Sequence, residues 1–501
     1  MKRSSGILMP VFSLPSEYGI GCMDEAAYDF VDKLAAAGQS YWQVLPMGPT
    51  GYGDSPYQSF STFAGNPYFI SPKPFIREGY LTEAECMEAS RGTGTSKVAY
   101  GLLFQSRLNL LEKVYNRCQE KLKQDLDFQN FQKENESWLP EYGLFMAVKE
   151  KFNHQGYRDW EDAAIRRHEE KACQQYKEEL QHRVTFYCFL QWVFNRQWKE
   201  LKDYANQRGI QIIGDIPIYV SPDSADVWGS PELFQIDEGG NPVGVAGCPP
   251  DAFSATGQLW GNPLYRWEEH KRTGYGWWIK RIQKCFEWYD VVRIDHFRGF
   301  DEYYFIPYGD KTAEHGKWMP GPGMDLFRAM KEKLGELPII AEDLGFLTDS
   351  VRQLLKDSGF PGMKVLQFAF DEREESDYLP YHYERNSVVY TGTHDNNTTR
   401  GWLRDIPKAD KEVAIRYMGV GKHTSNKKLT EALVSLAMNS VSNLCIIPMQ
   451  DYLCLPRFAR INTPSTLGNN WTWRMKKKDF DEALCKKIRR ITKLSGRISE
   501  K

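Results

Sequence analysis

The chain has 501 residues, 41% of them hydrophobic and 26% charged, so it can bury a large core and is not expected to be disordered. Its 64 basic and 66 acidic residues give a net charge of −2, which disfavours nucleic acid or an anionic membrane surface as a partner. No window is apolar for long enough to span a membrane, and the apolar run before Pro10 is too short for a signal peptide. The ten cysteines include no CxxC pair and indicate a reducing, cytoplasmic environment.

Short runs of β-branched and aromatic residues, each ending in a polar or glycine-rich turn, recur eight times along the chain. Most are separated by amphipathic helical stretches, which is typical of βα units and a parallel sheet. Eight such units predict an α/β fold of the (β/α)8 TIM barrel type. A doubly wound open sheet is the alternative, although no glycine-rich phosphate loop follows an early strand. The predicted strands cover residues 6–12, 41–46, 210–220, 290–295, 338–345, 362–370, 387–395 and 443–451.

Two connections are too long for ordinary loops and predict insertions after strands 2 and 3. Residues 51–205 are expected to form a mostly helical subdomain, and residues 221–289, rich in Gly, Pro and Trp, a loop-rich one. Both leave the carboxyl ends of strands, where barrel enzymes place their active sites. The tail after residue 456 has no strand signal and is expected to pack as helices. We therefore predict one catalytic barrel over 1–501 and no C-terminal β-sandwich domain.

Charged side chains stand at the ends of four predicted strands. The carboxyl ends of parallel barrel strands meet at one rim, so these side chains are expected to lie close together. Each acidic residue alone could instead cap the following helix, and the strand 290–295 by itself leaves a structural ion pair open. A shared site is favoured over the alternative that all of these acidic residues cap helices. The residues are Asp215 on the third strand, Arg293 and Asp295 on the fourth, Glu342 and Asp343 on the fifth, and His394 and Asp395 on the seventh.

Clustered carboxylates raise at least one pKa, while Arg293, on the same strand face as Asp295, would keep that carboxylate ionised. One ionised and one protonated carboxyl group is the pairing that cleavage of a glycosidic bond requires. Metal binding is less favoured, because Arg293 would repel a cation and barrel metal sites usually add more imidazoles. No GxSxG motif and no cysteine with a plausible base is present to supply another nucleophile. We therefore expect no metal and no organic cofactor.

Two loops indicate what kind of molecule enters the site. Residues 48–68 and 247–265 mix Gly, Ser, Asp and Asn with aromatic residues such as Tyr57 and Trp260. Sugar rings offer apolar faces to aromatic side chains and hydroxyl groups to short polar ones, so this mixture suits a saccharide cleft. For any single aromatic residue, simple packing against the insertion is the alternative.

Several long motifs carry a family resemblance that covers nearly the whole chain. They are "GYGDSPYQSFSTFAGNPY", "GDIPIYVSPDSADVW", "PPDAFSATGQLWGNPLYRW", "RIDHFRGF", "AEDLG", "GTHDNNTTRGW" and "INTPSTLGNNWTWR". The chain resembles the amylomaltase family of 4-α-glucanotransferases, within the α-amylase clan. The resemblance implies transfer of a segment of a 1,4-α-D-glucan to the 4-hydroxyl of an acceptor glucan or glucose by a retaining double displacement. Maltooligosaccharides and glucans derived from starch or glycogen would be the donors.

The resemblance also implies roles for individual residues. Asp295 matches the nucleophile, Glu342 the general acid and base, and Asp395 the carboxylate that holds sugar hydroxyls in the transition state. Implied substrate-binding residues are Tyr57, Ser55, Asp215, Trp260, Arg293, His296, His394 and Asn462, with Tyr52 and Tyr100 resembling a remote aromatic pair that guides long glucans.

Two positions depart from the family pattern. Ala99 stands where an Asp is expected, beside Tyr100, which puts the remote pair in doubt. Ser465 stands where a Gly is expected, which leaves the core chemistry untouched.

The residues themselves do not choose between a sugar and water as the acceptor, since that choice depends on ångström-scale loop geometry. An α-glucan hydrolase with the same residues is therefore the alternative enzyme. A glycan-binding protein on an inactive barrel is a further alternative, but it predicts loss of an acidic residue at position 295, 342 or 395, and all three are present. The preferred donor length and the oligomeric state stay open.

Overall fold

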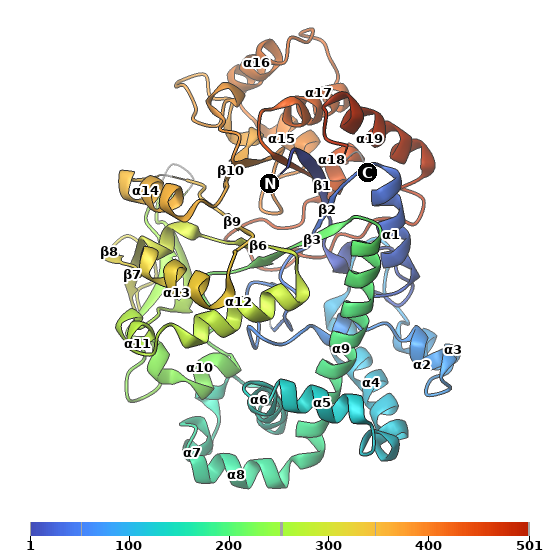
Figure 1. Cartoon of the computed structure of the whole chain (residues 1–501), viewed down its shortest axis with the longest axis vertical. Helices are drawn as coiled ribbons and strands as arrows, with labels where there is room; N and C mark the ends of the chain where they lie inside the picture. Colours follow the sequence, from blue (N-terminus) through green and yellow to red (C-terminus); the bar gives the residue numbers. More distant parts are fainter. Residues whose placement is uncertain (1, 52, 251–253, 346, 499–501) are drawn as a thin grey trace.

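The computed structural model describes residues 2–51, 53–250, 254–345 and 347–498. Eight parallel strands form one sheet in the order β10-β11-β12-β1-β2-β3-β6-β9, which confirms the predicted α/β barrel (Figure 1). Each strand falls within or overlaps one of the eight predicted runs. The strands are β1 (Ser4–Leu8), β2 (Tyr41–Gln43), β3 (Gln211–Ile216), β6 (Val291–Ile294), β9 (Ile339–Ala341), β10 (Gly362–Val365), β11 (Ser387–Tyr390) and β12 (Leu444–Pro448).

The barrel is nearly closed between β9 and β10, which are joined by single hydrogen bonds rather than by a ladder. Ala341 N donates to Pro361 O at 3.0 Å, and Met363 N donates to Asp343 Oδ1 at 2.6 Å. Asp343 therefore links two strand ends, and Thr348 instead caps α14 (Asp349–Ser358). The capping role that the sequence left open for Asp343 is wrong.

The barrel interior is a small apolar cluster to which all eight strands contribute. Successive side chains of a strand alternate between the two faces, so every second residue points inward. Ile213 and Val291 point into this cluster, and Asp215 and Arg293, two positions further along the same strands, share their face. The cluster contains Leu8, Tyr41, Ile213, Val291, Ile340, Met363, Val365, Val388, Tyr390, Leu444 and Ile446. A charged layer thus follows the apolar layers toward the carboxyl ends of the strands.

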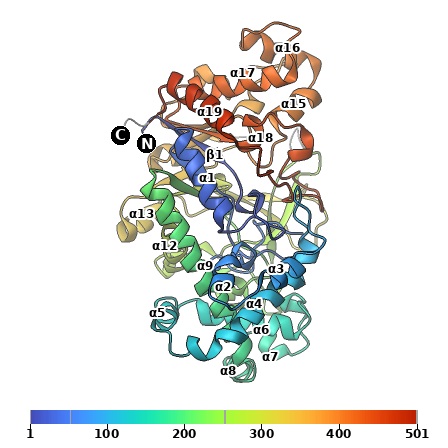
Figure 2. The ribbon, with the colours of Figure 1, turned by 90° about the vertical axis from the view of Figure 1, so that its right-hand side faces the viewer.

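Helices surround the sheet, and the inserted helices gather at the lower end of Figures 1 and 2. The helices that accompany the barrel are α1 (Glu25–Ala36), α9 (Gln181–Gln207), α12 (Gly276–Trp288), α13 (Met324–Leu334), α14, α15 (Thr399–Asp405), α16 (Lys408–Tyr417), α17 (Asn426–Asn439), α18 (Met449–Tyr452) and α19 (Glu482–Leu494). Between β2 and β3 the chain also forms α2 (Lys73–Arg77), α3 (Glu83–Ala89), α4 (Tyr100–Leu122), α5 (Leu126–Glu134), α6 (Leu139–Lys151), α7 (Ala163–Arg166) and α8 (Glu170–Glu179).

A second, antiparallel sheet of order β5-β4-β7-β8 was not predicted. Its strands are β4 (Gly244–Cys248), β5 (Gln258–Pro263), β7 (Glu302–Pro307) and β8 (Lys317–Pro320), and α10 (Ala225–Gly229) and α11 (Trp267–Arg272) lie in the same region of the chain. The segment 221–289, expected to be rich in loops, thus supplies two strands, β5 at the edge of this sheet and β4, which pairs with β7 after β6. The strands "GVAGC" and "QLWGNP" contain glycine and proline, which are depleted in strands, so they carry little β signal.

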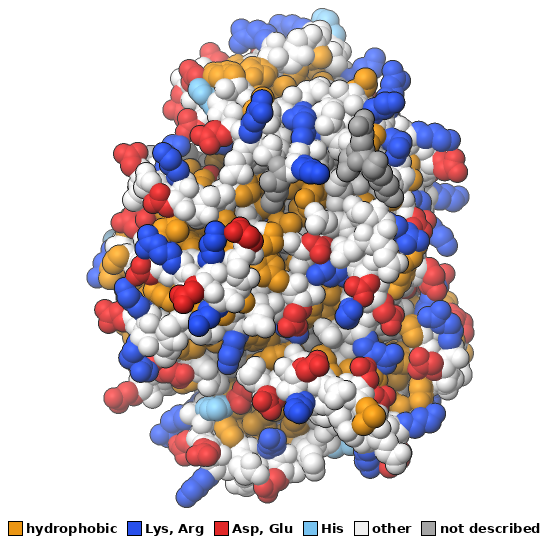
Figure 3. Space-filling model, in the orientation of Figure 1, with side chains coloured by type: hydrophobic (Ala, Val, Ile, Leu, Met, Phe, Trp, Pro, Cys, Tyr) orange, Lys and Arg blue, Asp and Glu red, His pale blue; other side chains and the backbone are white. Residues whose placement is uncertain are grey.

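The two ends of the described chain lie close together in Figure 2, and Arg3 Nε donates to Ser495 O at 2.9 Å. β12 is the last strand before residue 498, and α19 follows it. Acidic and basic side chains are interspersed over the face in Figure 3, in keeping with the small net charge. Among the helices that the structure describes, none has the length and apolar character needed to cross a membrane.

Candidate active site

Arg293 lies at the centre of a buried charged cluster at the carboxyl end of the barrel. Asp215 on β3 is the register partner of Arg293 on β6, so the pairing of the two strands sets the two side chains beside each other. Arg293 Nη1 lies 2.7 and 2.8 Å from the two carboxylate oxygens of Asp215, and Nη2 lies 3.0 Å from Asp295 Oδ1. Asp215 is 0% exposed and Arg293 is 3% exposed, so neither charged group is solvated. The buried arginine is compensated by two carboxylates.

The backbone turn after β6 holds Glu342 against Asp295. His296 adopts a left-handed conformation with φ 53°, and its N–H donates to Glu342 Oε2 at 2.6 Å. The other carboxyl oxygen, Oε1, accepts from Leu344 N at 2.9 Å. Since Asp295 directly precedes His296, this turn brings Glu342, which follows β9, near Asp295, which follows the adjacent strand β6.

Burial raises the pKa of both Asp295 and Glu342, and the charges around each group add to or oppose this rise. Desolvation and the charges of Asp215 and Asp395 raise the pKa of Asp295 to about 6, although Arg293 opposes the rise. Desolvation and the neighbouring Asp295 charge raise the pKa of Glu342 to about 8, against the opposing effects of Arg293 and the two backbone N–H groups. These shifts favour a proton on Glu342 and a negative charge on Asp295 within the pair. Arg293 does not bring Asp295 to an ordinary carboxyl pKa, because burial outweighs it.

The third predicted carboxylate, Asp395, is oriented by the segment that follows β12. Asn462 Nδ2 donates to Asp395 Oδ1 at 2.6 Å, and Arg460 Nη2 donates to the Asp395 carbonyl oxygen at 2.6 Å. His394 Nε2 lies 3.4 Å from the same Oδ1 atom. Arg460 was not predicted as a site residue, because an arginine that binds a backbone carbonyl leaves no pattern in the sequence.

Aromatic rings form one wall of the cluster. Tyr57 donates its hydroxyl hydrogen to Asp215 Oδ2 at 2.9 Å and stacks on His394, with centroids 5.2 Å apart and an interplanar angle of 17°. Ser55 Oγ accepts from Tyr57 N at 3.3 Å and so steadies the turn that carries the ring. The ring centroid of Trp471 lies 5.8 Å from that of Tyr57. Trp471 was not among the predicted site residues.

Trp260 and His296 form a second aromatic contact beside the cluster. Their rings meet edge to face with centroids 4.8 Å apart. Burial lowers the pKa of His296 to about 4, so its imidazole is neutral at neutral pH. His296 Nε2 is buried and has no hydrogen-bond partner within the described chain. A buried polar atom without a partner costs free energy, so this nitrogen is suited to a hydroxyl group of a bound ligand.

Of the remote aromatic pair that the resemblance implied, only Tyr100 lies among the described residues. Tyr52 lies outside the described residues. Tyr100 is only 8% exposed, and its hydroxyl donates to Trp471 O at 3.0 Å, so its ring offers almost no surface to a passing glucan. Ala99 occupies the N-cap position of α4 without a side-chain cap, which is a position where Asp is favoured. Ser465 has φ 61°, the conformation that favours the expected glycine.

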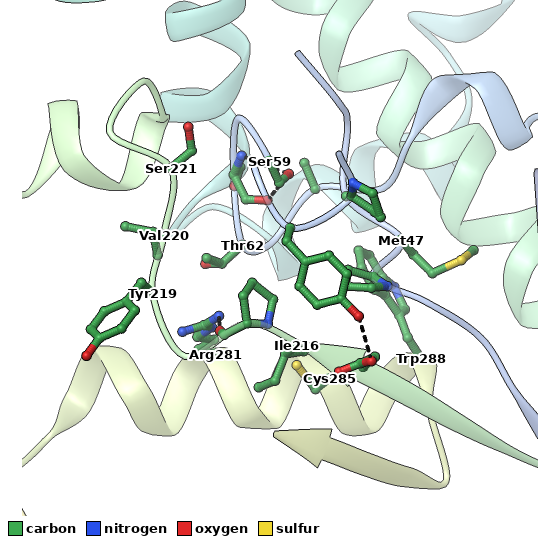
Figure 4. Close-up of a pocket in the computed structure, with 18 of the residues that line it drawn as sticks. Met47, Ser59, Thr62, Ile216, Tyr219, Val220, Ser221, Arg281, Cys285 and Trp288 are labelled. Carbon is green, nitrogen blue, oxygen red and sulfur yellow. Dashed lines mark hydrogen bonds between the residues drawn. The ribbon is translucent and has the colours of Figure 1, made fainter. Parts of the chain in front are cut away.

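A cavity of about 40 Å³ lies behind Tyr57 and Asp215, and Figure 4 shows the residues around it. Thr62, Ile216 and Tyr219 line it together with Arg281 of α12. Tyr219 is buried, and its hydroxyl has no partner among the described residues. No group of three or more His, Cys, Asp or Glu side chains in the described part of the chain could hold a metal ion.

The chain is similar to known proteins along almost its whole length. The family model described as 4-alpha-glucanotransferase matches residues 9–479. A 4-alpha-glucanotransferase of Clostridium butyricum is 48% identical over 98% of this chain and 100% of its own, and one of Streptococcus pneumoniae is 47% identical over 100% and 98%. Among solved structures, an amylomaltase from Streptococcus agalactiae in complex with acarbose superposes with a TM-score of 0.96 at 42% identity, covering 99% of this chain and 100% of that one.

Proposed function

The chain belongs to the 4-alpha-glucanotransferase family, and we propose that it carries out the transfer by a retaining double displacement with Asp295 as nucleophile and Glu342 as general acid and base. The observation that carries this assignment is the geometry of the two carboxyl groups: Arg293 Nη2 lies 3.0 Å from Asp295, and the N–H groups of His296 and Leu344 hold Glu342 at the same rim of the barrel. Donors would be maltooligosaccharides and glucans derived from starch or glycogen, and acceptors would be glucans or glucose.

In the first step the Asp295 carboxylate attacks the anomeric carbon while Glu342 gives its proton to the leaving glycosidic oxygen. The bond to that oxygen breaks, and a covalent glycosyl-enzyme forms through an oxocarbenium-like transition state. In the second step the ionised Glu342 takes the proton of the acceptor 4-hydroxyl, whose oxygen displaces Asp295 from the anomeric carbon. Two inversions leave the α configuration unchanged.

The other residues of the cluster bind and orient the sugar at the cleaved bond. We assign Asp395 to the sugar hydroxyls, supported by the two groups that fix its position, Asn462 and Arg460. Arg293 would keep Asp295 charged and correctly oriented, and Asp215 accepts hydrogen bonds from both Arg293 and Tyr57. Hydrogen bonds that are stronger in the transition state than in the ground state would accelerate the step. Trp260 and His296 would close over the donor.

We further propose that the insertions 51–205 and 221–289 line the glucan cleft. Supporting this, Tyr57 of the first contacts Asp215 and His394, and Trp260 of the second contacts His296. A cytoplasmic location is also proposed, since the cysteines form no disulfide among the described residues and most are buried.

The pH dependence of kcat/KM should be bell-shaped, with an acid limb near pH 6 and an alkaline limb near pH 8. Below the pKa of Asp295, about 6, the nucleophile becomes protonated and the rate falls. Above the pKa of Glu342, about 8, the acid loses its proton and the rate falls again. Initial rates with maltotriose from pH 4 to 10 check this, and a rate that keeps rising above pH 9 would contradict the assignment of Glu342.

Incubation of the purified protein with maltotriose alone tests the function directly. We expect glucose and a ladder of longer maltooligosaccharides, with the total number of reducing ends constant. Each transfer breaks one glycosidic bond and makes another, so reducing ends are neither gained nor lost. A rise in reducing ends that matches the bonds cut would instead show hydrolysis.

A further inference from the structure

A pocket of about 530 Å³ lies outside the site described above, between α15, the start of α17 and residues 456–458. Three arginines face it against a single carboxylate. The residues that matter for its chemistry are Arg400, Arg404, Arg457, Asp405, Asn426 and Phe458. The side chains of the pocket therefore carry an excess of positive charge, although the whole chain has a net charge of −2.

The arginines are only weakly compensated. Arg404 forms no ion pair and no side-chain hydrogen bond within the part of the chain that the structure describes. Arg457 Nη1 lies 3.9 Å from Asp405 Oδ2, at the long limit of an ion pair, and its side chain is 71% exposed. Arg400 donates to the Cys454 carbonyl oxygen at 3.1 Å through Nη1. Most guanidinium donors therefore remain available to a ligand.

Two further features point to the same kind of ligand. Asn426 is the first residue of the 14-residue helix α17, whose N-terminal end adds partial positive charge to the pocket. Phe458 is 65% exposed and offers an apolar face beside the arginines. Guanidinium groups match the oxygens of a phosphate with paired hydrogen bonds, and several of them stabilise a dianion better than a monoanion.

We propose that this pocket binds a phosphate group, either as free phosphate or as a phosphate ester on a sugar whose ring lies against Phe458. The binding does not depend on the proposed function. Any effect of this binding on catalysis does depend on the proposed function. Two hydrogen bonds connect the pocket to the segment around Asp395. Asn397, two residues after Asp395, donates to Asp405 Oδ2 at 2.8 Å, and Arg460, three residues after Arg457, donates to the Asp395 carbonyl oxygen.

The pocket is also close enough to the cleft to take a phosphate carried by a glucan. Phe458 and Asn462 are four residues apart, so their Cα atoms are separated by at most ~14 Å. Asn462 holds Asp395. One glucan could therefore place a phosphorylated ring in the pocket while other rings of the same molecule occupy the cleft. Such simultaneous binding would make phosphorylated glucans a preferred substrate class.

Isothermal titration calorimetry of the full chain with inorganic phosphate at low ionic strength tests the site. We expect saturable binding at one site. The double variant Arg404→Gln/Arg457→Gln should weaken it about tenfold per arginine, the loss of one charge-assisted hydrogen bond each. The matched control is Arg91→Gln/Arg328→Gln, which removes two exposed arginines, 77% and 71% exposed, elsewhere on the surface. It should bind phosphate like the wild type.

The proposal is overturned if the wild type shows no saturable phosphate binding, or if the R404Q/R457Q variant binds as tightly as the control. Glucose 6-phosphate separates the two sources of phosphate. Tighter binding than inorganic phosphate, lost in Phe458→Ala, supports a sugar-borne phosphate, whereas equal affinity supports free phosphate. Asp295→Asn should bind phosphate normally, so failure of the proposed catalytic mechanism and failure of this site are distinguishable.

Discussion

Asp295→Asn should lower the rate of maltotriose disproportionation by at least about 10⁴-fold, the scale on which removal of a catalytic nucleophile acts. An amide oxygen is a poor nucleophile, so no covalent intermediate forms. The change is almost isosteric, and Arg293 stays paired with Asp215 at 2.7 Å, so no buried charge is left alone. Neutralising Asp295 also removes repulsion from Asp215 and Asp395. The variant should therefore be folded and no less stable than the wild type.

Three measurements check this prediction together: product analysis from maltotriose, the melting temperature, and the same two readouts for Asp325→Asn. Asp325 lies on α13, pairs with Lys271 on the surface and is 44% exposed, so its amide substitution is a matched control that should keep full activity. A stable Asp295→Asn protein that disproportionates maltotriose at a rate near that of the control would refute the nucleophile assignment.

The barrel was predictable because its strands carry a strong local signal. Runs such as "VVRI" and "SVVY" are buried on both faces, which requires the continuous β-branched sequence that the prediction used. The side sheet was missed because β4 and β5 are short and hold glycine and proline, and because β4 pairs with β7, a partner far away in sequence. Local sequence patterns indicate local conformation but do not indicate which distant strands pair.

The residues of the candidate site also fall into two groups: those predicted from strand patterns and those revealed only by tertiary contacts. Asp215, Arg293 and Asp295 follow from strand alternation, because side chains two apart share a face and neighbouring strands share a rim. Arg460 and Trp471 act through a backbone carbonyl and through ring packing, contacts that only the folded chain creates. The burial of Tyr100 also depends on tertiary packing, since the same tyrosine on an exposed loop would have been free to bind.

Glu342→Gln should separate the two chemical steps. Without a proton to give, transfer from maltotriose should fall about 10²- to 10⁴-fold, the usual contribution of general acid–base catalysis. A donor whose leaving group needs no proton should escape this loss in the first step. With α-maltosyl fluoride, Asp295 attacks the anomeric carbon, the carbon–fluorine bond breaks and fluoride leaves as the anion. The glycosyl-enzyme then accumulates, because the substituted amide cannot take the proton of the acceptor hydroxyl.

A fluoride-selective electrode should therefore record a burst of about one fluoride per active site from the Glu342→Gln enzyme, followed by slow turnover. Asp295→Asn should give no burst, because the attacking carboxylate is gone. Glu332→Gln, an exposed glutamate of α13, is the matched control and should turn over both donors like the wild type. If Glu342→Gln gives no fluoride burst, so that the first step is lost with the fluoride as well as with maltotriose, Glu342 acts in binding or folding rather than as the acid. The wild-type pKa of about 8 would then reflect only a buried carboxyl group beside Asp295.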